Sequence, residues 1–182
     1  VVCISKVTKE ILDNVAPEID SEYLPHAVHS NIFKPISNDQ ERRLAKDLRN
    51  KILDQCQTKN PNKKIFFWNN RNARRKQSGT LIWWFKEWLD KVGHDKAMLL
   101  MHTDPRDPHG QDLPHLINHL GLDSGQVLLS TNKVPSEQLA NMYRAADYTI
   151  NISDAEGFGL ATLESLSCGT PIIVNMTGGL QE

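Results

Sequence analysis

From Lys64 to Val174 the sequence alternates short apolar runs with amphipathic stretches, and this alternation constrains the fold more than any other feature. The apolar runs are expected to be strands, at 65–68, 97–101, 126–130, 148–152 and 171–174. The stretches between them are expected to be helices, at 81–92, 112–120, 136–146 and 159–168. Apolar strands that are each followed by a helix are typical of a parallel sheet covered on both faces. The predicted fold class is therefore doubly wound α/β.

The helix at 81–92 is expected to bury one face, because its apolar residues recur at spacings of three and four. That face would hold Leu81, Trp84, Phe85, Trp88, Leu89 and Val92. The tryptophans at 83, 84 and 88 are interpreted as core or interdomain surface residues, in preference to aromatic platforms that stack on a sugar. The helix at 136–146 is expected to open with an N-cap signal at Ser136.

The first sixty residues follow a different pattern. A strand is expected at 1–5, a helix at 6–15, an extended segment at 23–28 and a long polar helix at about 38–57. Pro25 and Pro35 bracket a predicted linker. The first residues carry no initiator Met and no basic segment, so the chain is expected to begin within a longer protein.

Composition narrows the range of partners. Twenty-one Lys and Arg against 22 Asp and Glu leave a formal net charge of -1, which provides no global field for nucleic acid or an anionic membrane. No apolar run approaches the roughly 18–20 residues of a membrane span. Three separated cysteines without a C-x-x-C spacing predict free thiols and a cytoplasmic location. Residues 74–76 form a short basic run that could instead bind RNA, but this is the weaker interpretation.

The chemistry is expected at the carboxyl ends of the strands, where open α/β sheets bind ligands. After the run at 148–152, residues 153–164 read S-D-A-E-G-F-G-L-A-T-L-E. This segment places a glycine-flanked turn at a helix N-terminus, with carboxylates at Glu156 and Glu164. The segment therefore offers free backbone N–H groups and carboxylates that can accept hydrogen bonds from a polyol. His115 and His119 are spaced to share a helix face, but no third ligand accompanies them, and no metal site is predicted.

Here the sequence resembles the family 4 retaining glycosyltransferases with the GT-B fold. Glu156 and Glu164 match the family's E-x7-E signature, and residues 165–174 look like its E-A-x-A-x-G-x-P-V-V run. The resemblance implies that Glu164 holds the ribose hydroxyls and that Glu156 contacts the transferred sugar. It also implies that the glycine turn faces the diphosphate and sugar, through Gly157, Phe158, Gly159 and Leu160.

A second match lies at 70–76, which resembles the family's G-R-x-x-x-x-K. The resemblance implies that Arg71 and Lys76 grip the diphosphate and act with Glu156 as the catalytic set. Asn70 stands where the family usually has Gly, and it is expected to line the nucleotide-sugar site. Val134, in a segment that looks like the family's loop beside the base, is expected to contact the base.

The resemblance makes the expected fold a Rossmann-like sheet, the C-terminal half of a GT-B glycosyltransferase. Residues 1–35 would be the end of the acceptor-side half and a linker. Residues 36–182 would be the nucleotide-sugar-binding domain, truncated at its C-terminal end. The expected activity is hexosyl transfer from a UDP- or GDP-sugar to a glycan or lipid-linked acceptor bound through the missing N-terminal half, as in polysaccharide biosynthesis.

No cofactor is expected, because the departing nucleoside diphosphate could be stabilised without a metal. Arg71, Lys76 and a helix N-terminus would together supply roughly +2.5 charges, and no D-x-D motif is present. Two alternatives stay open, a nucleotide-sugar epimerase of the same fold and a domain that only binds a nucleotide.

Overall fold

A computed structural model describes residues 1–57 and 59–181 of the chain. Thr58 and Glu182 lie outside the described residues, and Glu182 is the last residue of the predicted nucleotide-sugar-binding domain.

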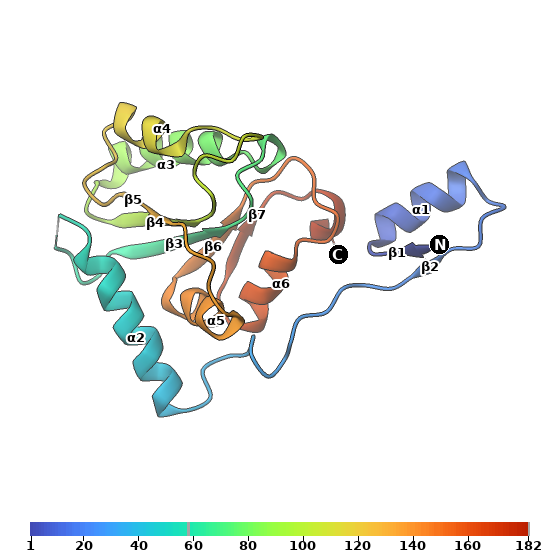
Figure 1. Cartoon of the computed structure of the whole chain (residues 1–182), viewed down its shortest axis with the longest axis horizontal. Helices are drawn as coiled ribbons and strands as arrows, with labels where there is room; N and C mark the ends of the chain where they lie inside the picture. The colour runs from blue at the N-terminus through green and yellow to red at the C-terminus, as the bar shows by residue number, and fades with distance from the viewer. Residues whose placement is uncertain (58, 182) are drawn as a thin grey trace.

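The centre of the molecule is a five-stranded parallel sheet in the order β5-β4-β3-β6-β7 (Figure 1). Its strands are β3 (Lys64–Asn69), β4 (Ala97–His102), β5 (Val127–Ser130), β6 (Tyr148–Asn151) and β7 (Ile172–Val174). All five predicted strands are confirmed, with ends that differ by at most one residue. The order makes β3 the central strand and places β6 beside it, so the loops that follow these two strands leave the sheet at adjacent positions.

Helices cover both faces of this sheet. They are α2 (Asp39–Asp54), α3 (Ser78–Val92), α4 (Leu113–His119), α5 (Ser136–Ala145) and α6 (Leu160–Ser167). Helices α3 and α4 lie on one face, and α2, α5 and α6 lie on the other (Figure 1). Strand side chains alternate between the two cores: Ile65 and Phe67 join the α2–α5 side, and Trp68 joins the α3–α4 side. This arrangement confirms the predicted doubly wound α/β class.

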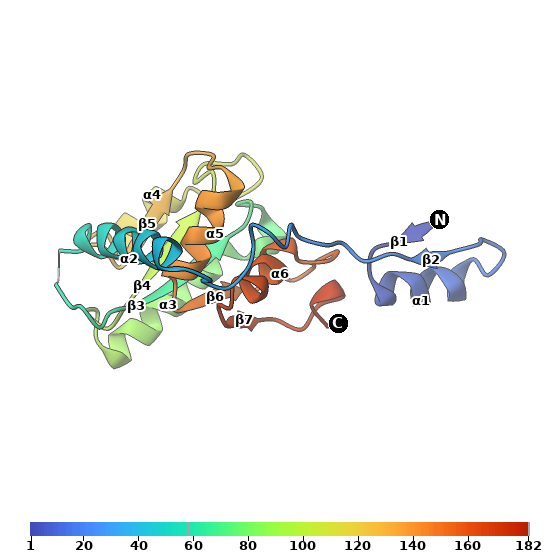
Figure 2. The same cartoon turned by 90° about the horizontal axis from the view of Figure 1, so that it is seen from below.

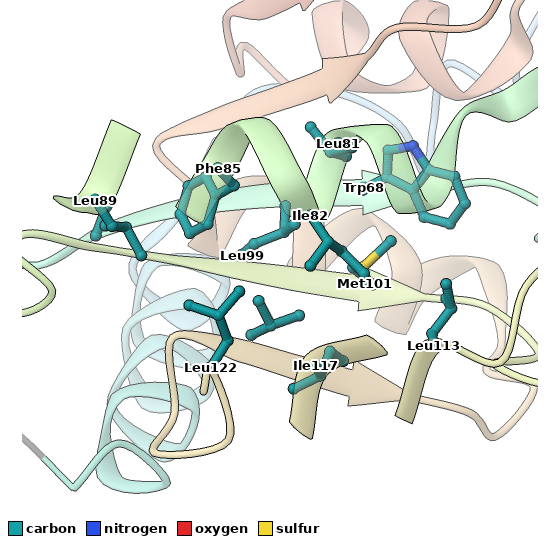
Figure 3. Close-up of a cluster of buried hydrophobic side chains, with 12 residues drawn as sticks. Trp68, Leu81, Ile82, Phe85, Leu89, Leu99, Met101, Leu113, Ile117 and Leu122 are labelled. Carbon is teal, nitrogen blue, oxygen red and sulfur yellow. The ribbon is translucent and has the colours of Figure 1, made fainter. Parts of the chain in front are cut away.

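Figure 3 shows how α3 packs on the sheet, with Leu81, Ile82, Phe85 and Leu89 directed into the core. The predicted face was wrong in part. The other members of that face remain substantially exposed: Trp84 at 55%, Trp88 at 39% and Val92 at 40%. The six predicted residues form two rows, one through Phe85 and one through Trp84, each with a spacing of four. The rows lie about 60° apart around the helix, because each residue turns the helix by about 100°. The row through Phe85, together with Ile82, faces the sheet, and the row through Trp84 lies outside it. The tryptophans are therefore surface residues rather than core.

Two further local expectations need correction. Helix α5 begins at Ser136 itself, and Pro135 occupies the N-cap position without a side-chain hydrogen bond. The predicted first strand is shorter than expected, because β1 (Val2–Cys3) ends before Ser5. Ser5 instead caps α1 (Lys6–Val15), where its hydroxyl accepts from the Thr8 N–H at 3.1 Å.

The N-terminal residues form a small βαβ unit of β1, α1 and β2 (Glu22–Tyr23), whose two strands pair in parallel. Figures 1 and 2 show this unit at the end of an extended segment, away from the five-stranded sheet. That segment is fixed to α5, since the Arg144 guanidinium donates to the carbonyls of Ile32 and Lys34 at 2.8 and 2.9 Å. The boundary predicted between residues 35 and 36 stays a prediction.

Two expectations from composition can be compared with the structure. The three cysteines, Cys3, Cys56 and Cys168, are free and buried, as predicted. Across 1–57 and 59–181, no helix combines the length and the apolar character needed to cross a membrane.

Candidate functional site

The loops after β3 and β6 meet at the carboxyl edge of the sheet. The Asp154 N–H donates to the Arg75 carbonyl at 2.8 Å and joins the two backbones. The Gln77 amide also donates to the Asp154 carboxylate. Gln77 has φ 55°, the one positive φ outside glycine among the described residues. The short 3-10 helix η1 (Arg74–Lys76) therefore turns sharply into α3, which brings Lys76 toward the β6 loop.

Lys76 and Glu156 form a buried ion pair where these loops meet. The Lys76 Nζ donates to Glu156 Oε1, and the two side chains are 9% and 6% exposed. The same Oε1 accepts from Asn151 Nδ2 at 2.9 Å and from Ser153 Oγ at 3.1 Å. Arg75 lies beside them, with Nη1 2.7 Å from the Ala155 carbonyl and 3.5 Å from Glu156 Oε2. Glu156 is thus fixed by donors from both loops.

The surroundings of this pair favour an ionised carboxylate. Burial would raise the pKa of Glu156, but the hydrogen bonds from Lys76, Asn151 and Ser153 outweigh it and lower the pKa below its usual value. Burial lowers the pKa of Lys76, and the hydrogen bond to Glu156 opposes that change. The site therefore holds a carboxylate able to accept from a ligand and an ammonium that a ligand phosphate could share.

Arg71 is held away from this ion pair by another loop. Its Nε donates to Asp107 Oδ2 at 2.6 Å, and its Nη2 lies 3.2 Å from Asp107 Oδ1 and 2.9 Å from His109 Nδ1. The hydrogen bond from Arg71 holds the pKa of Asp107 well below its usual range. Buried Asn72 joins the same loops, since its Nδ2 donates to the Gln111 carbonyl at 2.7 Å.

These pairings correct the predicted charge. Adding Arg71, Lys76 and a helix end gave roughly +2.5 charges, but Asp107 and Glu156 neutralise the two cations in the structure. The positive charge left near the loop comes from Arg74 and Arg75 instead. The Arg74 guanidinium has no hydrogen bond or ion pair to the described residues, and it lines a cavity of about 410 Å³ with Gln77, Ser78, Gly110 and Gln111.

Glu164 has a different environment, on α6. Its Oε2 accepts from the Tyr143 hydroxyl at 2.7 Å, and the Tyr143 oxygen accepts from Asn69 Nδ2 at 2.9 Å. Burial raises the pKa of Glu164, and the hydrogen bond from Tyr143 opposes this effect in part. Within the described residues no cation pairs with Glu164. Its surroundings suit a ligand that brings neutral hydroxyl donors.

The glycine turn between the two carboxylates opens α6. Gly159 is the N-cap residue, with φ 88° and no side-chain hydrogen bond to cap the helix. The 3-10 helix η2 (Gly178–Gln181) packs on this turn, and a Cβ at Gly178 would lie 1.8 Å from the Glu156 carbonyl oxygen. Phe158 packs edge-on against His26 at 5.3 Å between ring centroids, and Leu160 is 44% exposed.

The remaining predicted residues lie at different distances from this network. Asn70 follows β3 directly, and its backbone needs no positive φ, so an Asn fits where the resemblance has Gly. Val134 precedes α5 and packs against the core on the α2–α5 side. His115 and His119 do share a face of α4, with ring centroids 6.3 Å apart. In the described part of the chain, no group of three potential metal ligands occurs.

Sequence reasoning missed several partners of the predicted residues. Asn151 and Ser153 could have been noticed, because they lie within five positions of Glu156 in the same loop. The contacts of Asp107 and Tyr143 could not be predicted, since each belongs to a segment distant in sequence from the residue that it contacts.

Comparison with known proteins identifies relatives of the whole described region. The profile of the family described as glycosyl transferases group 1 matches residues 49–182. Alpha-monoglucosyldiacylglycerol synthase of Streptococcus pneumoniae is 26% identical over 175 residues, covering 96% of this chain and 37% of that protein. D-inositol 3-phosphate glycosyltransferase of Thermobispora bispora is 41% identical over 78 residues, covering 41% of this chain and 18% of that protein. The chain thus spans less than half the length of these relatives.

Solved structures agree on the fold. Sucrose-phosphate synthase from Thermosynechococcus elongatus superposes with a TM-score of 0.76 at 23% identity, over 99% of this chain and 41% of that one. Anabaena HepE, solved with UDP and glucose, gives a TM-score of 0.71 at 16% identity, over 99% and 45% of the two chains. These likenesses confirm the predicted Rossmann-like sheet of the C-terminal half of a GT-B glycosyltransferase. With the family profile covering most of its length, the chain belongs to the glycosyl transferases group 1 family.

Proposed function

We propose that this chain is the donor-binding half of a retaining hexosyltransferase and that it binds a UDP- or GDP-sugar at the loops after β3 and β6. The observation that carries the proposal is the buried Lys76–Glu156 pair, held at the carboxyl edge of the sheet and joined by the glycine turn to Glu164. In open α/β sheets this edge is where ligands bind. The likeness to relatives that are glycosyltransferases supports the same reading.

The proposed roles follow the chemistry of each group. Glu164 would accept from the ribose hydroxyls, since Tyr143 occupies one of its oxygens and no cation within 1–57 and 59–181 neutralises it. Glu156 would accept from hydroxyls of the transferred sugar, because its lowered pKa keeps it ionised at neutral pH. Backbone N–H groups of residues 157–160 would face the diphosphate, beside the helix N-terminus.

Breaking the glycosidic bond places negative charge on the departing nucleoside diphosphate, and cations must stabilise that charge. Lys76 is the cation nearest to Glu156 and would share its protons with a phosphate oxygen. Arg71 would turn from Asp107 toward the diphosphate, with Arg74 and Arg75 adding positive charge. On this proposal no divalent metal is needed.

Transfer would require the other half of the enzyme. We propose that a glycan or lipid-linked acceptor binds through an N-terminal, acceptor-side half and that residues 1–35 belong to its end and to the linker. The names of the relatives include an inositol phosphate and a diacylglycerol derivative as their own substrates or products. A cytoplasmic location stays part of this proposal.

A thermal-shift panel of UDP, GDP and ADP, with and without a chelator, tests the proposal. A ligand at about 100 times its Kd stabilises the folded protein by about 2.7 kcal/mol. We expect one diphosphate to raise the melting temperature and the chelator to change its affinity by less than about twofold. We also expect no sugar transfer by this chain alone. Failure of all three nucleotides to bind would refute nucleotide recognition, and a large effect of the chelator would refute metal independence.

A further inference from the structure

The partner of Glu164 is itself oriented by a second residue. Tyr143 is fully buried on α5, and its ring packs edge-on against Phe67 at 5.1 Å and Phe33 at 6.3 Å between centroids. Asn69, at the end of β3, lies on the other side of the phenol oxygen. Three elements, β3, α5 and α6, therefore meet in the chain of hydrogen bonds from Asn69 to Tyr143 to Glu164.

The direction of each hydrogen bond follows from donor chemistry. The Asn69 Nδ2 can only donate, so the Tyr143 oxygen accepts from it. The Tyr143 O–H is then left to donate to Glu164 Oε2, which accepts as an ionised carboxylate. Glu164 Oε1 makes no hydrogen bond to any described residue, and it is not among the buried side-chain atoms that lack a partner. It therefore reaches solvent.

We propose that Tyr143, oriented by Asn69, is a positioning residue that fixes Glu164 through Oε2 and leaves Oε1 for the ribose of the nucleotide. The inference rests on the proposed function, in which Glu164 accepts from the ribose. It adds a specific device: a phenol that holds the carboxylate in one orientation and favours its ionised form. A rigid, correctly charged acceptor loses less conformational entropy when the nucleotide binds.

The hydrogen bond from Tyr143 predicts how nucleotide affinity depends on pH. The hydrogen bond from Tyr143 lowers the pKa of Glu164, so removing the hydroxyl leaves burial unopposed and raises that pKa. A group with a higher pKa becomes protonated at a higher pH, and a protonated Glu164 no longer accepts at both oxygens. Without the Tyr143 hydroxyl, nucleotide affinity should therefore begin to fall at a higher pH as the solution is acidified.

The other described groups that face Glu164 do not titrate between about pH 5 and about pH 8. From α5, burial holds the pKa of Tyr143 far above its ordinary value. Cys168, one turn further along α6, has a thiol whose pKa burial raises to about 11. From β3, the facing side chain is the uncharged Asn69. Glu164 itself is thus the group expected to respond between about pH 5 and about pH 8.

The experiment is calorimetric titration of the 182-residue chain and its Tyr143→Phe variant with UDP, GDP and ADP across that pH range. Taking the ratio of variant to wild-type Kd cancels the titration of the ligand phosphates. We expect Tyr143→Phe to weaken binding by about threefold to tenfold at about pH 8. The ratio should grow by a further factor of about three toward about pH 5. Asn69→Ala, which keeps the phenol but removes its orienting donor, should show the same trend at smaller amplitude.

Tyr148→Phe is the matched control, because it removes a phenol hydroxyl from β6 rather than from α5 and leaves the Tyr143–Glu164 contact in place. Tyr148 stacks on Phe66 at 5.4 Å, and its hydroxyl makes no hydrogen bond to the described residues. A Tyr143→Phe ratio that is independent of pH and equal to the Tyr148→Phe ratio would overturn the inference. Should Tyr143→Phe fail to fold, a pH-independent ratio for Asn69→Ala would overturn it.

Glu164→Gln separates this inference from the proposed function. Reduced nucleotide binding by Glu164→Gln, together with an inert Tyr143→Phe, would refute the positioning role and leave the ribose role intact. Wild-type binding by Glu164→Gln would refute the ribose role and the positioning role together. Failure of the wild-type chain to bind any of the three nucleotides would also overturn both.

Discussion

Glu156 and Glu164 lie eight positions apart on one loop and helix, yet their surroundings oppose each other. Glu156 is bound by an ammonium, an amide and a hydroxyl, and its pKa is lowered. Glu164 receives one phenol hydroxyl and, among the described residues, no cation, and its pKa is raised. The same functional group therefore has two different environments. Under the proposed function, a diphosphate would rearrange the charged network around Glu156, and Glu164 would accept from neutral hydroxyl donors.

The two carboxylates also act on stability in opposite directions. The lowered pKa of Glu156 contributes stability that is present above the unfolded-state pKa and is lost as pH falls through the folded-state value. The raised pKa of Glu164 gives a contribution that is present at low pH and is lost as pH rises through the folded-state value. Glu164 thus costs stability at neutral pH, a cost that is consistent with the binding role proposed for it.

The largest effect should come from breaking the charged network at Lys76. Lys76→Met leaves Glu156 buried without its ammonium, and we expect the free energy of unfolding to fall by about 3 kcal/mol. Diphosphate binding by the folded protein should weaken by about 1.5–3 kcal/mol. Urea unfolding monitored by circular dichroism, and calorimetry with the nucleotide that binds wild type, measure the two losses.

Lys64→Met is the matched control for that prediction. Lys64 begins β3 and pairs with Asp147 at 3.0 Å, but its side chain is 56% exposed, so the loss should stay below about 1 kcal/mol. Adding Glu156→Gln to Lys76→Met should recover much of the lost stability, because the buried charge is then removed as well. Equal losses for the two lysine variants would contradict a special role for the Lys76–Glu156 pair.

The next effect should appear at Glu164, where Tyr143 supplies one donor and, under the proposed function, the ribose supplies the others. Removing the 2′-hydroxyl from the nucleotide should cost wild type about 1–3 kcal/mol, because part of the carboxylate then stays unpaired. In Glu164→Ala, the ribonucleotide and its 2′-deoxy analogue should bind weakly and nearly alike. A double cycle should therefore show coupling of at least about 0.5–1 kcal/mol.

Glu87→Ala controls for the loss of a helical carboxylate, since Glu87 is exposed on α3. It should preserve both the affinity and the preference for ribose. A Glu164→Ala protein that binds weakly yet keeps the full ribose preference would show that Glu164 is not the ribose ligand.

Local patterns predicted the elements of this fold well, because each strand and helix is encoded by its own residues. The order of the strands is not encoded in this way. The sequence placed Lys76 and Glu156 in loops at the same edge, but only the β5-β4-β3-β6-β7 order makes those loops adjacent. The spacing of apolar residues likewise predicted a broad apolar face on α3 but not how much of that face is buried. Trp84 and Trp88 were therefore assigned to the buried face, although they are exposed.

The charges of the site were harder to predict than its residues. Arg71 and Lys76 were identified from their spacing, but their carboxylate partners come from other loops. Asp107 lies in a polar loop after β4 that has no motif, and its contact with Arg71 depends on Asn72 joining the two loops. A sum of formal charges along the sequence cannot include such pairings. Glu164 posed the same problem, since its partner Tyr143 comes from a different helix.

The smallest and most discriminating effect is expected for Glu156→Gln, which removes a charge but keeps the shape of the side chain. Gln can still accept from Lys76, so the fold should persist. Lys76 is no longer neutralised, however, and free diphosphate should bind within about twofold of wild type or somewhat more tightly. The intact nucleotide-sugar should lose about tenfold, or about 1.4 kcal/mol, because a charged acceptor for its hydroxyls becomes a neutral one.

Calorimetry with UDP and UDP-glucose, or with the GDP pair if that base binds, measures this difference. Asp154→Asn is the matched control, since Asp154 lies two positions earlier in the same loop and contacts Gln77 rather than Lys76. It should affect the two ligands equally. Equal losses of both ligands in Glu156→Gln would assign Glu156 to holding the loop, through Asn151 and Ser153, rather than to the sugar. A loss confined to the nucleotide-sugar would place this carboxylate at the sugar, and tighter binding of the free diphosphate would show that Glu156 restrains Lys76 in the wild-type protein.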